Sequence, residues 1–469
     1  MISTKMTAAK QVRSPFSTDA QPDQSAVGAH LLDLPGKRMG TGGPSANVTG
    51  GQSDPITACS PVSTPDKPFS TITDGVTGLP IQPATSPPVV DSADPSAAPA
   101  LYIVFLNDNA TSERLGLSNR VQRLLGSQPA DTLFQNLNGF TARLTPAQAK
   151  LLQGNPAVRG LEADQVVSLA QPIGQSNTAT AARRGTSTQS TPYGVPMVWG
   201  STNYSAANNS GKYAIVLDTG VSTQTGDLNV NSTYSRNFTS NNPFDWIDYN
   251  NHGTHVAGTI AAINDSDGVV GVAAGANIIS IRVLDSKGSG LTSWITNGIN
   301  YAAGLVKSGG LKGVAIQNLV ANLSLGGGLN PTLDNAVRAA ATPDGWGRYL
   351  RFAVAAGNSA ADVDTISPAN TGDHPNIYTV SAVNASRTQA SFSNFDNIGD
   401  SIDDCDFSAP GVGVQSLGRT AGTLITMSGT SMASPHMAGA LLMGTPLTSS
   451  PISTPVLAGA AGDPMVLLS

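Results

Sequence analysis

The chain has 469 residues, of which 12% are charged, well below the roughly 25% that is typical of globular proteins. Its formal net charge of −6 argues against a protein that holds nucleic acid through phosphate contacts. It has no apolar run of about 18 residues, so no membrane-spanning helix is expected. Two cysteines, Cys59 and Cys405, cannot make a disulfide framework. Stability therefore has to come from a packed core, with bound ions as a further source.

The charge is distributed unevenly along the chain. Residues 1–185 have a net charge of +1, whereas residues 186–469 carry 11 Lys and Arg against 18 acidic residues, all of them Asp. Short carboxylates suit turns, helix caps and hard-cation sites better than exposed helix faces. The C-terminal part is therefore expected to be rich in loops and to have an acidic surface.

Residues 1–98 are mostly Ser, Thr, Pro, Gly and Ala without sustained periodicity, which predicts a disordered low-complexity region. The N-terminus lacks the apolar core of a secretory signal peptide. It is basic, rich in hydroxyl side chains and free of acids until Asp19, as a plastid transit peptide is. A misplaced start codon is an equal alternative.

Residues 99–170 are expected to form a small α+β domain of the ferredoxin-like β-α-β-α-β type. Apolar runs and alternation predict strands over 101–106, 134–144 and 158–169, and helical spacing predicts a helix over 112–125. A second helix is predicted after Thr145, its N-cap, with Leu151 and Leu152 on the buried side. Residues 171–186 are polar, as expected of a linker.

Residues 187–469 are expected to fold as an α/β domain whose parallel sheet is covered by helices on both faces. Apolar, β-branched runs predict strands over 214–217, 278–284, 320–325, 352–356 and 378–383. Helical spacing of apolar residues predicts helices over 255–263, 293–306 and 333–341. Ligands of such sheets bind at the carboxyl ends of the strands.

Four chemically active residues lie at the ends of these predicted elements. Asp218 and Asn358 follow buried strands, and His252 and Ser431 begin helices. Together they suit acyl transfer, in which the imidazole of His252 removes a proton from Ser431 and Asp218 orients that imidazole. The amide of Asn358 and the backbone N–H of Ser431 would stabilise the oxyanion of the tetrahedral intermediate.

Each residue also has a simpler interpretation. Asp218-Thr-Gly is typical of a turn, and Ser431 is typical of a helix N-cap. His252 and His255 are spaced as two metal ligands could be, but no Glu-x-x-His motif accompanies them. The chain order Asp, His, Ser is one of the orders known for this triad, and the joint pattern favours acyl transfer.

The segments Asp218-Thr-Gly, His252-Gly-Thr-His-Val-Ala-Gly-Thr and Gly429-Thr-Ser-Met-Ala-Ser-Pro-His resemble the three signature segments of the subtilisin-like serine proteases. The resemblance extends over residues 189–439 and is closest to the proteinase K branch. It implies an endopeptidase that cleaves proteins through an acyl-enzyme and needs no catalytic metal. It also implies the family's substrate-binding positions, namely Ser324, Leu325, Gly326, Gly327, Gly288, Gly290, Ala355 and Gly357.

Residues 99–170 resemble the family's inhibitory propeptide, including the segment Asn138-Gly-Phe-Thr-Ala-Arg-Leu. The resemblance implies a zymogen whose cleft is occupied by the C-terminal tail of the propeptide until a cut between Leu169 and Gln189. Autocatalysis and a basic-specific enzyme acting at Arg183-Arg184 are both open as the source of this cut. An ordinary α+β domain without an inhibitory role is the simpler alternative.

A structural calcium ion is the second implication of the resemblance. The tentative ligands are Asp227, Asp265, the carbonyl of Ile263, and Gln189, and oxygen ligands of this kind suit a hard cation. Gln189 is expected to become available only after maturation. Without calcium, the loop around Asp265 is simply rich in turns.

The predicted function is that of a secreted or lumenal serine endopeptidase, a monomer that acts on protein or peptide substrates. The sequons Asn231-Ser-Thr and Asn237-Phe-Thr permit secretion. The alternative is a catalytically silent binding protein of the same fold. A Ser-Glu-Asp peptidase is excluded because residues 186–469 contain no glutamate. Only 38 residues follow Ser431, so apolar surface is expected to be left uncovered at that end.

Overall fold

The computed structural model describes residues 99–107, 133–134, 139–169, 176–181, 189–200, 209–396, 404–444, 447–450 and 463–468. The chain divides into two units, residues 1–83 and residues 84–469, and the described residues belong to the second unit. The predicted disordered region over 1–98 and the predicted helix over 112–125 lie outside the described residues.

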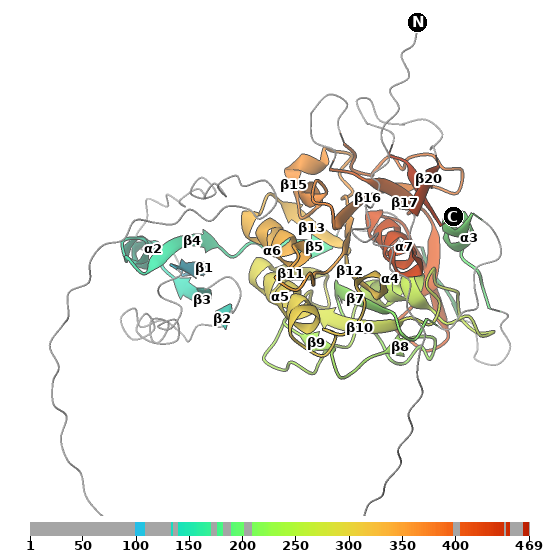
Figure 1. The fold of residues 1–469 in the computed structure, drawn as a ribbon, viewed down its shortest axis with the longest axis horizontal. Coiled ribbons are helices and arrows are strands. Elements are labelled where there is room, and N and C mark those ends of the chain that lie inside the picture. Colours follow the sequence, from blue (N-terminus) through green and yellow to red (C-terminus); the bar gives the residue numbers. More distant parts are fainter. Residues whose placement is uncertain are drawn as a thin grey trace, which may run out of the picture. The chain divides into compact units, whose positions relative to one another are not determined.

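A large, mostly parallel sheet forms the centre of the described chain (Figure 1). Its strands are hydrogen-bonded in the order β20-β21-β17-β16-β14-β12-β7-β10-β8, with β9 also paired to β10. All of these pairs are parallel except β20 with β21. The bounds are β7 Tyr213–Asp218, β8 Asn229–Val230, β9 Arg236–Asn237, β10 Asn277–Arg282, β12 Leu319–Leu323, β14 Phe352–Ala355, β16 Ile377–Val383, β17 Phe407–Pro410, β20 Leu447–Ser450 and β21 Met465–Leu468.

Side chains of β7 alternate between two cores on the two faces of this sheet. Ala214 and Val216 belong to a core with helices α4 (His252–Ala261) and α7 (Thr430–Met443). Ile215 and Leu217 belong to a core with α5 (Thr292–Lys307) and α6 (Pro331–Ala341), and Figure 1 shows the helix pairs on opposite faces. The predicted α/β architecture with helices on both faces is confirmed.

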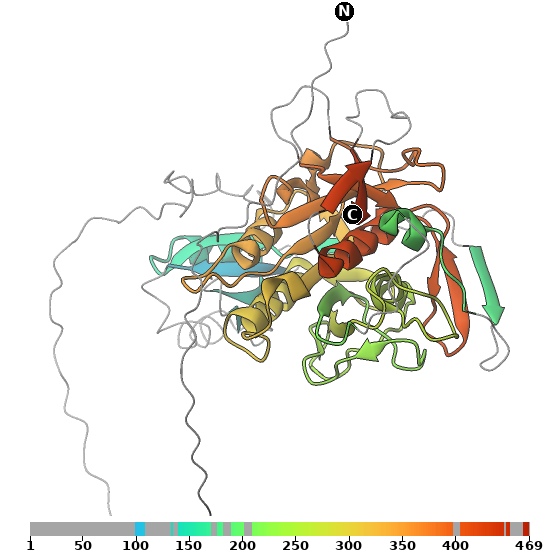
Figure 2. The same ribbon diagram turned by 45° about the vertical axis from the view of Figure 1, so that its right-hand side comes forward.

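The end of the described chain differs from the expectation. Strand β21 pairs with β17 at Ser408 and Met465, and the side chains of Met465 and Val466 are fully buried. The short helix α3 (Gly194–Trp199) lies against β21 and α7 (Figure 2). The expected uncovered apolar surface is therefore filled at this position by the chain's own last described strand.

A second, smaller sheet contains β1 (Ala100–Leu106), β2 (Leu133–Phe134), β3 (Gly139–Leu144) and β4 (Val158–Ala163) in the order β2-β3-β1-β4. The pairs of β1 with β3 and β4 are antiparallel. Helix α2 (Pro146–Gln153) begins as predicted, with the Thr145 side chain accepting from the Gln148 N–H in a capping box. Leu152 is buried as predicted, but Leu151 is 69% exposed, so its predicted burial is wrong.

The predicted strand over 158–169 is two strands in the structure. After β4, residues Asp164 and Gln165 make contacts with the start of α5, and β5 (Val166–Leu169) leaves the small sheet. It pairs with β11 (Ser289–Leu291) and β13 (Leu325–Gly328), and β13 also pairs with β15 (Ile366–Ser367). The segment predicted as one strand thus contributes to two different sheets.

A further three-stranded sheet joins β18 (Val414–Leu417), β19 (Thr423–Met427) and β6 (Ser176–Ala181). All its pairs are antiparallel, and Figure 2 shows β6 beside the β18–β19 hairpin. None of the described helices is both long and apolar enough to cross a membrane.

Candidate active site

Asp218 and His252 form a buried hydrogen-bonded pair at the carboxyl end of the central strand β7. The Nδ1 atom of His252 lies 2.9 Å from Oδ1 and 3.0 Å from Oδ2 of Asp218, and neither residue is exposed to solvent. The Nε2 atom of His252 is buried without a hydrogen-bond partner among the described residues. A proton on Nδ1 held by the carboxylate leaves Nε2 as the nitrogen that can accept another proton.

A further residue that was not identified from the sequence, Asp248, holds the start of α4 and thereby His252. The Oδ1 atom of Asp248 accepts from the Thr219 hydroxyl and from the Asn250 and Asn251 N–H groups, and its Oδ2 atom accepts from the Thr254 N–H and hydroxyl. A carboxylate at this position satisfies N–H groups that a helix start leaves unpaired. Asp248 stands four residues before His252, which is the sequence signal that could have identified it.

Gly253 is required by the close approach of α4 to β7. A Cβ atom at Gly253 would lie 2.1 Å from the Gly220 carbonyl oxygen and 3.1 Å from the Asp218 Cβ. The hydroxyl of Thr219 accepts the Gly253 N–H at 3.0 Å. Any side chain at Gly253 would push the helix that carries His252 away from Asp218.

Ser431 lies in the first turn of α7, and α7 packs against α4. Its side chain is buried, and its hydroxyl donates to the carbonyl oxygen of Ser324 at 3.2 Å. The hydroxyl of Ser324 donates to the Ser431 carbonyl at 3.0 Å and lies 2.9 Å from the Ser434 hydroxyl. Ser324 follows β12, so this strand end and the start of α7 are held together.

The side-chain amide of Asn358 is oriented by Thr430, the residue before Ser431. Its Oδ1 atom accepts from the Thr430 N–H at 2.9 Å and from the Thr430 hydroxyl at 3.0 Å. The Nδ2 atom would lie 3.1 Å from a Cβ atom built on Gly429, so the NH₂ group is directed to the segment that leads into Ser431. Sequence reasoning identified Asn358 but not Thr430.

Asn394 supports the loop that carries Asn358, and it too was missed from the sequence. Its Oδ1 atom accepts from the Ser359 and Ala361 N–H groups, and its Nδ2 atom donates to the Ala356 carbonyl. Gly357 in this loop has a φ of +105°, which favours glycine, and a Cβ atom there would lie 2.4 Å from Asn394 Nδ2. Nothing local in the sequence connects residues that lie 35 positions apart.

The predicted substrate-binding residues line both sides of β5. Leu325 pairs with Leu169, Gly326 with Ser168, and Gly290 with Val167, while the Gly288 carbonyl accepts the Leu169 N–H at 2.9 Å. Gly327 pairs instead with Ser367 of β15, Ala355 is the last residue of β14, and Gly357 directly precedes Asn358. In the described chain, β5 thus occupies the space between β11 and β13 as an added antiparallel strand.

Three backbone carbonyl groups converge beside the buried carboxylate of Asp227. The amide nitrogen of Gln189 lies 2.7 Å from the Ile263 oxygen, 3.2 Å from that of Asp267 and 3.3 Å from that of Val269. Asp227 accepts the Ile263 and Val269 N–H groups, and burial raises its pKa to about 7. The side chain of Gln189 thus lies at this position, with its amide nitrogen and not its oxygen directed to the three carbonyls.

Asp265 is exposed, and its Oδ1 atom accepts the Asp267 N–H within the same loop. Among the described residues, no group of three or more His, Cys, Asp or Glu side chains could hold a metal ion. A cation at this position would therefore depend mainly on backbone carbonyls, with Asp227 as its buried carboxylate. This donor set is all oxygen, which fits calcium rather than a softer metal.

His255 does not join His252 in a metal site. Its Nε2 atom lies 3.0 Å from the Val414 carbonyl and 3.1 Å from the Ile425 carbonyl, on strands β18 and β19. Burial lowers the pKa of His255 to about 3, so its imidazole is neutral at physiological pH. His255 fastens α4 to this hairpin, which disfavours the zinc interpretation.

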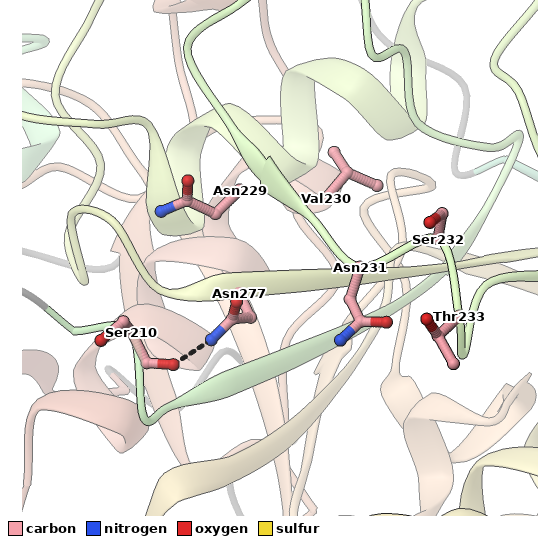
Figure 3. A pocket seen from close by; sticks show the side chains of 7 residues that line it. All are labelled: Ser210, Asn229, Val230, Asn231, Ser232, Thr233 and Asn277. Atoms are coloured by element: carbon pink, nitrogen blue, oxygen red, sulfur yellow. Dashed lines mark hydrogen bonds between the residues drawn. The ribbon is translucent and has the colours of Figure 1, made fainter.

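A polar hollow lies away from these groups. It has a volume of about 620 Å³ and is polar, and Figure 3 shows its lining residues Ser210, Asn229, Val230, Asn231, Ser232, Thr233 and Asn277. The sequon residue Asn231 lines it, whereas the sequon residue Asn237 is buried and donates to Ser240 and to the Asn242 carbonyl. The hollow contains none of the predicted catalytic residues.

A buried Asp–His pair, a helix-start serine and an oriented amide at the carboxyl edge of a parallel sheet are residue types that serine proteases use in acyl transfer. The subtilase family (Peptidase S8) matches residues 210–444. The chain therefore belongs to the subtilase family and is a subtilisin-like serine protease, as the sequence segments predicted.

Individual relatives agree with this assignment. Subtilisin NAT of Bacillus subtilis subsp. natto is 34% identical over 308 residues, which cover 66% of this chain and 70% of the relative. The subtilisin of Bacillus pumilus is 37% identical over 253 residues, 54% of this chain and 83% of the relative. A solved structure of a cold-adapted subtilisin-like serine proteinase is 33% identical, with a TM-score of 0.47, and covers 59% of this chain and 97% of its own.

Proposed function

We propose that this serine protease is an endopeptidase in which Ser431 attacks the scissile carbonyl, His252 accepts the serine proton at Nε2, and Asp218 holds the resulting imidazolium. The observation that carries the proposal is the fully buried Asp218–His252 pair, in which Nδ1 of His252 lies 2.9 Å from Oδ1 of Asp218. Helix α4, which carries His252, packs against α7, which carries Ser431. The mechanism requires the Ser431 hydroxyl, which donates to the Ser324 carbonyl here, to turn to Nε2 of His252 when substrate binds. Catalytic hydrogen bonds of this kind often tighten only when substrate is bound.

The oxyanion of the tetrahedral intermediate is stabilised by the amide of Asn358 together with the N–H of Ser431. The two hydrogen bonds from Thr430 fix the Asn358 oxygen and so direct its NH₂ group toward the serine. A donor that is oriented in advance needs no reorganisation when negative charge develops.

Trapping by a fluorophosphonate probe tests this proposal directly. The probe is expected to form a covalent adduct on Ser431, and labelling is expected to disappear in His252→Ala, because the serine is then no longer activated. Asn231→Ala, in the remote polar hollow, serves as the matched control and should be labelled normally. A folded chain that resists labelling would favour the alternative, a catalytically silent binding protein.

We further infer that residues 99–170 are an inhibitory propeptide and that the chain is a zymogen. Supporting observations are the seating of β5 between β11 and β13 and two carboxylate contacts with helix starts. Asp164 accepts the N–H and the hydroxyl of Ser293 at 2.9 and 2.6 Å, and Glu162 accepts the hydroxyl of Thr332. Ser293 and Thr332 lie in the first turns of α5 and α6, where carboxylates are favoured.

A structural calcium ion is proposed at the carbonyl cluster of Ile263, Asp267 and Val269, with Asp227 as a further ligand. Gln189 would join it only after its amide turns the oxygen to the site in place of Nε2, which donates to these carbonyls here. A bound cation would link the N-terminal segment of the protease to the loop after α4. It would stabilise the fold without taking part in the reaction. Asp265 is a weaker candidate for a calcium ligand, because its carboxylate already accepts the Asp267 N–H within its own loop.

The remaining proposals concern the substrates, location, oligomeric state and glycosylation of the protein. The substrates are proteins or peptides, secretion or a lumenal location is expected, and the protease is expected to act as a monomer. Asn231, open to the polar hollow, is the sequon more compatible with glycosylation, because the amide of Asn237 is already engaged in two hydrogen bonds.

A further inference from the structure

The asparagines of the chain's sequons differ in whether a sugar could be attached to them. Asn237 is 3% exposed, and its Nδ2 atom donates to Ser240 at 2.8 Å and to the Asn242 carbonyl at 2.9 Å. Asn322, in the sequon Asn322-Leu-Ser, is fully buried and donates to the Ser324 hydroxyl at 2.8 Å. A bulky glycan needs a surface position and a free NH₂ group, which neither residue offers.

Asn231 satisfies both conditions. The two residues that follow it in the sequon, Ser232 and Thr233, are exposed. The Oδ1 atom of Asn231 accepts the Tyr234 N–H at 3.2 Å, whereas no described residue accepts a hydrogen bond from its Nδ2 atom. Figure 3 shows the Nδ2 atom on the side of Asn277 and the oxygen on the side of Thr233. The amide is thus held by its oxygen, and its NH₂ group is left to the hollow.

The chemistry of the hollow suits a sugar. Its volume of about 620 Å³ lies within the range of about 300–1,000 Å³ that small ligands occupy, and no charged side chain lines it. The NH₂ group of Asn277 donates to the carbonyls of Ser210 and Lys212, and that of Asn229 donates to the Gly275 carbonyl at 2.9 Å. The Oδ1 atoms of Asn229 and Asn277 accept no hydrogen bond from a described residue, so both can accept from sugar hydroxyls.

The hollow lies at an edge of the large sheet. Strand β8 ends the strand order on this side, and among the described strands it pairs only with β10. Asn231 follows β8 directly, and its N–H donates to the Ile278 carbonyl of β10 at 2.7 Å. An edge strand of this kind offers unpaired backbone groups to other chains. A bulky polar group on Asn231 would cover that edge.

We propose that Asn231 carries an N-linked glycan whose first N-acetylglucosamine lies in the polar hollow, with its hydroxyls donating to Asn229 and Asn277. This inference rests on the proposed function, because attachment requires the secreted or lumenal location. The donor is a lipid-linked oligosaccharyl diphosphate, and a transferase of the secretory pathway catalyses the step. The bond between Nδ2 and C1 of the sugar forms, the bond between C1 and the diphosphate oxygen breaks, and Nδ2 loses one proton.

Glycopeptide mapping of the protein from its natural source tests the attachment. Peptide N-glycosidase in heavy-oxygen water is expected to convert Asn231 to a labelled aspartate and to leave Asn237 unlabelled. An unmodified Asn231 would overturn the inference, as would a glycan on Asn237. Fluorophosphonate labelling of Ser431 in the same sample separates this failure from failure of the proposed catalytic role.

The position of the first sugar is tested by two variants of the full chain, made in the uncut Ser431→Ala background in cells that glycosylate secreted proteins. Thr233→Ser keeps the sequon and Thr233→Ala removes it, so the two differ by one hydroxyl and the glycan. The Ser variant is expected to melt about 2–4 °C higher, the shift expected for roughly one additional hydrogen bond. Trimming its glycan to a single N-acetylglucosamine should preserve this difference, and loss of the difference on trimming would overturn the proposal. The same two variants made in bacteria should melt alike, and an equal gap there would assign the difference to the hydroxyl instead.

A second substitution asks whether the sugar contacts the hollow. The melting difference between Thr233→Ser and Thr233→Ala is expected to shrink when Asn277→Ala is added to both, and the intrinsic cost of Asn277→Ala cancels in this comparison. Asn376→Ala is the matched control, because its Nδ2 atom also donates to a backbone carbonyl, that of Ala341, outside the hollow. An undiminished difference in Asn277→Ala would show that the sugar does not lie in the hollow.

Discussion

The small sheet of residues 100–163 and the large sheet of the protease bury their faces in different ways. In the large sheet both faces contact helices of the same domain, and the strand β7 is fully buried on each side. In the small sheet one face has its own core around Val104 and Phe140. The opposite face carries Ile103, Thr141 and Glu162, which are at most 8% exposed, and Glu162 reaches across to Thr332 of α6.

This difference indicates which of the two sheets can fold without the other. A domain of about 70 residues buries a modest share of its surface and has little stability to spare. Here the second face of the small sheet is buried with polar groups such as Glu162, which has Thr332 at the start of α6 as its partner. The large sheet is thus expected to be the autonomous part, and the small one to be stable mainly while attached.

The largest expected effect is a loss of catalytic activity in a variant whose large sheet stays folded. Ser431→Ala should lower activity by on the order of 10⁴ to 10⁶, a range that comes from the same triad in subtilisin. It should also leave the precursor uncut if maturation is autocatalytic. Peptide hydrolysis and gel analysis measure both, and the melting temperature should stay within a few degrees of the parent. Normal removal of the small sheet in this variant would assign the cut to another protease.

Asn358→Ala is expected to lower kcat by about 10²- to 10³-fold with little change in KM, since the amide acts on the transition state. The magnitude again comes from the corresponding donor in subtilisin. Steady-state kinetics on a peptide substrate measure both constants. Thr430→Val keeps the amide but removes its hydroxyl partner, and it should give a smaller loss in the same direction. An unchanged kcat in Asn358→Ala would rule out the proposed oxyanion role.

The attachment of the small sheet is expected to weaken by about 10- to 100-fold in Asp164→Ala, because two hydrogen bonds to a carboxylate are lost together. The Ser431→Ala background keeps the chain uncut, and hydrogen exchange of β5 and of the α5 start reports the opening. Lys150→Ala, on the exposed side of α2, is the matched control. Equal exchange in the two variants would mean that the small sheet does not rely on the protease.

Removal of calcium by a chelator is expected to lower the melting temperature of the processed enzyme, by an amount that grows with the free calcium concentration of the reference sample. Asp227→Asn keeps the side-chain shape but loses the charge, and its melting temperature should no longer respond to calcium. Asp285→Asn, in a different loop, should respond like the parent. A parent enzyme indifferent to chelator would argue against the cation at the carbonyl cluster.

The smallest expected effect is a change in the pH dependence of stability, and it concerns Asp404, a buried acid three residues before β17. Burial, with a hydrogen bond to Asp364, raises the pKa of Asp404 to about 8. A pKa raised on folding contributes stability at low pH, and that contribution is lost as the pH rises toward 8. Asp404→Asn should therefore raise the melting temperature at pH 8 by a few degrees and have little effect at pH 4, as measured by thermal unfolding.

Asp344→Asn provides a control of opposite sign. Hydrogen bonds from the N–H of Arg348 and Trp346 lower the pKa of Asp344, so its ionised form is favoured in the folded chain. Its removal should slightly lower the melting temperature at pH 8. A destabilising Asp404→Asn at that pH would show that the carboxylate is favoured there after all.

The sequence predicted those residues of the site that lie in short contiguous motifs. Asp218, His252, Ser431 and Asn358 each stand at the end of a predicted element, and parallel topology brings such ends to one edge. The supporting residues were missed for a physical reason. Asn394 acts on Ser359 across 35 positions and Thr430 acts on Asn358 across 72, so only the folded chain reveals these pairs.

Errors in the fold had a similar origin. The sequence predicted a strand over 158–169 but not the change of partner at Asp164, because Val158–Ala163 and Val166–Leu169 are both strands and their different partners lie far away in the sequence. In α2, which has only eight residues, Leu151 and Leu152 look alike in sequence, and the direction of the helix decides that only Leu152 is buried.

Cys405 is 2% exposed, and burial raises the pKa of its thiol far above the usual range. Such a thiol hardly ionises and hardly meets reagents. Once the segment containing Cys59 has been removed, the protease would have no reactive sulfhydryl, and maleimides should leave it untouched. A cysteine placed at the exposed Trp346 would then be a unique attachment point for a fluorescent dye.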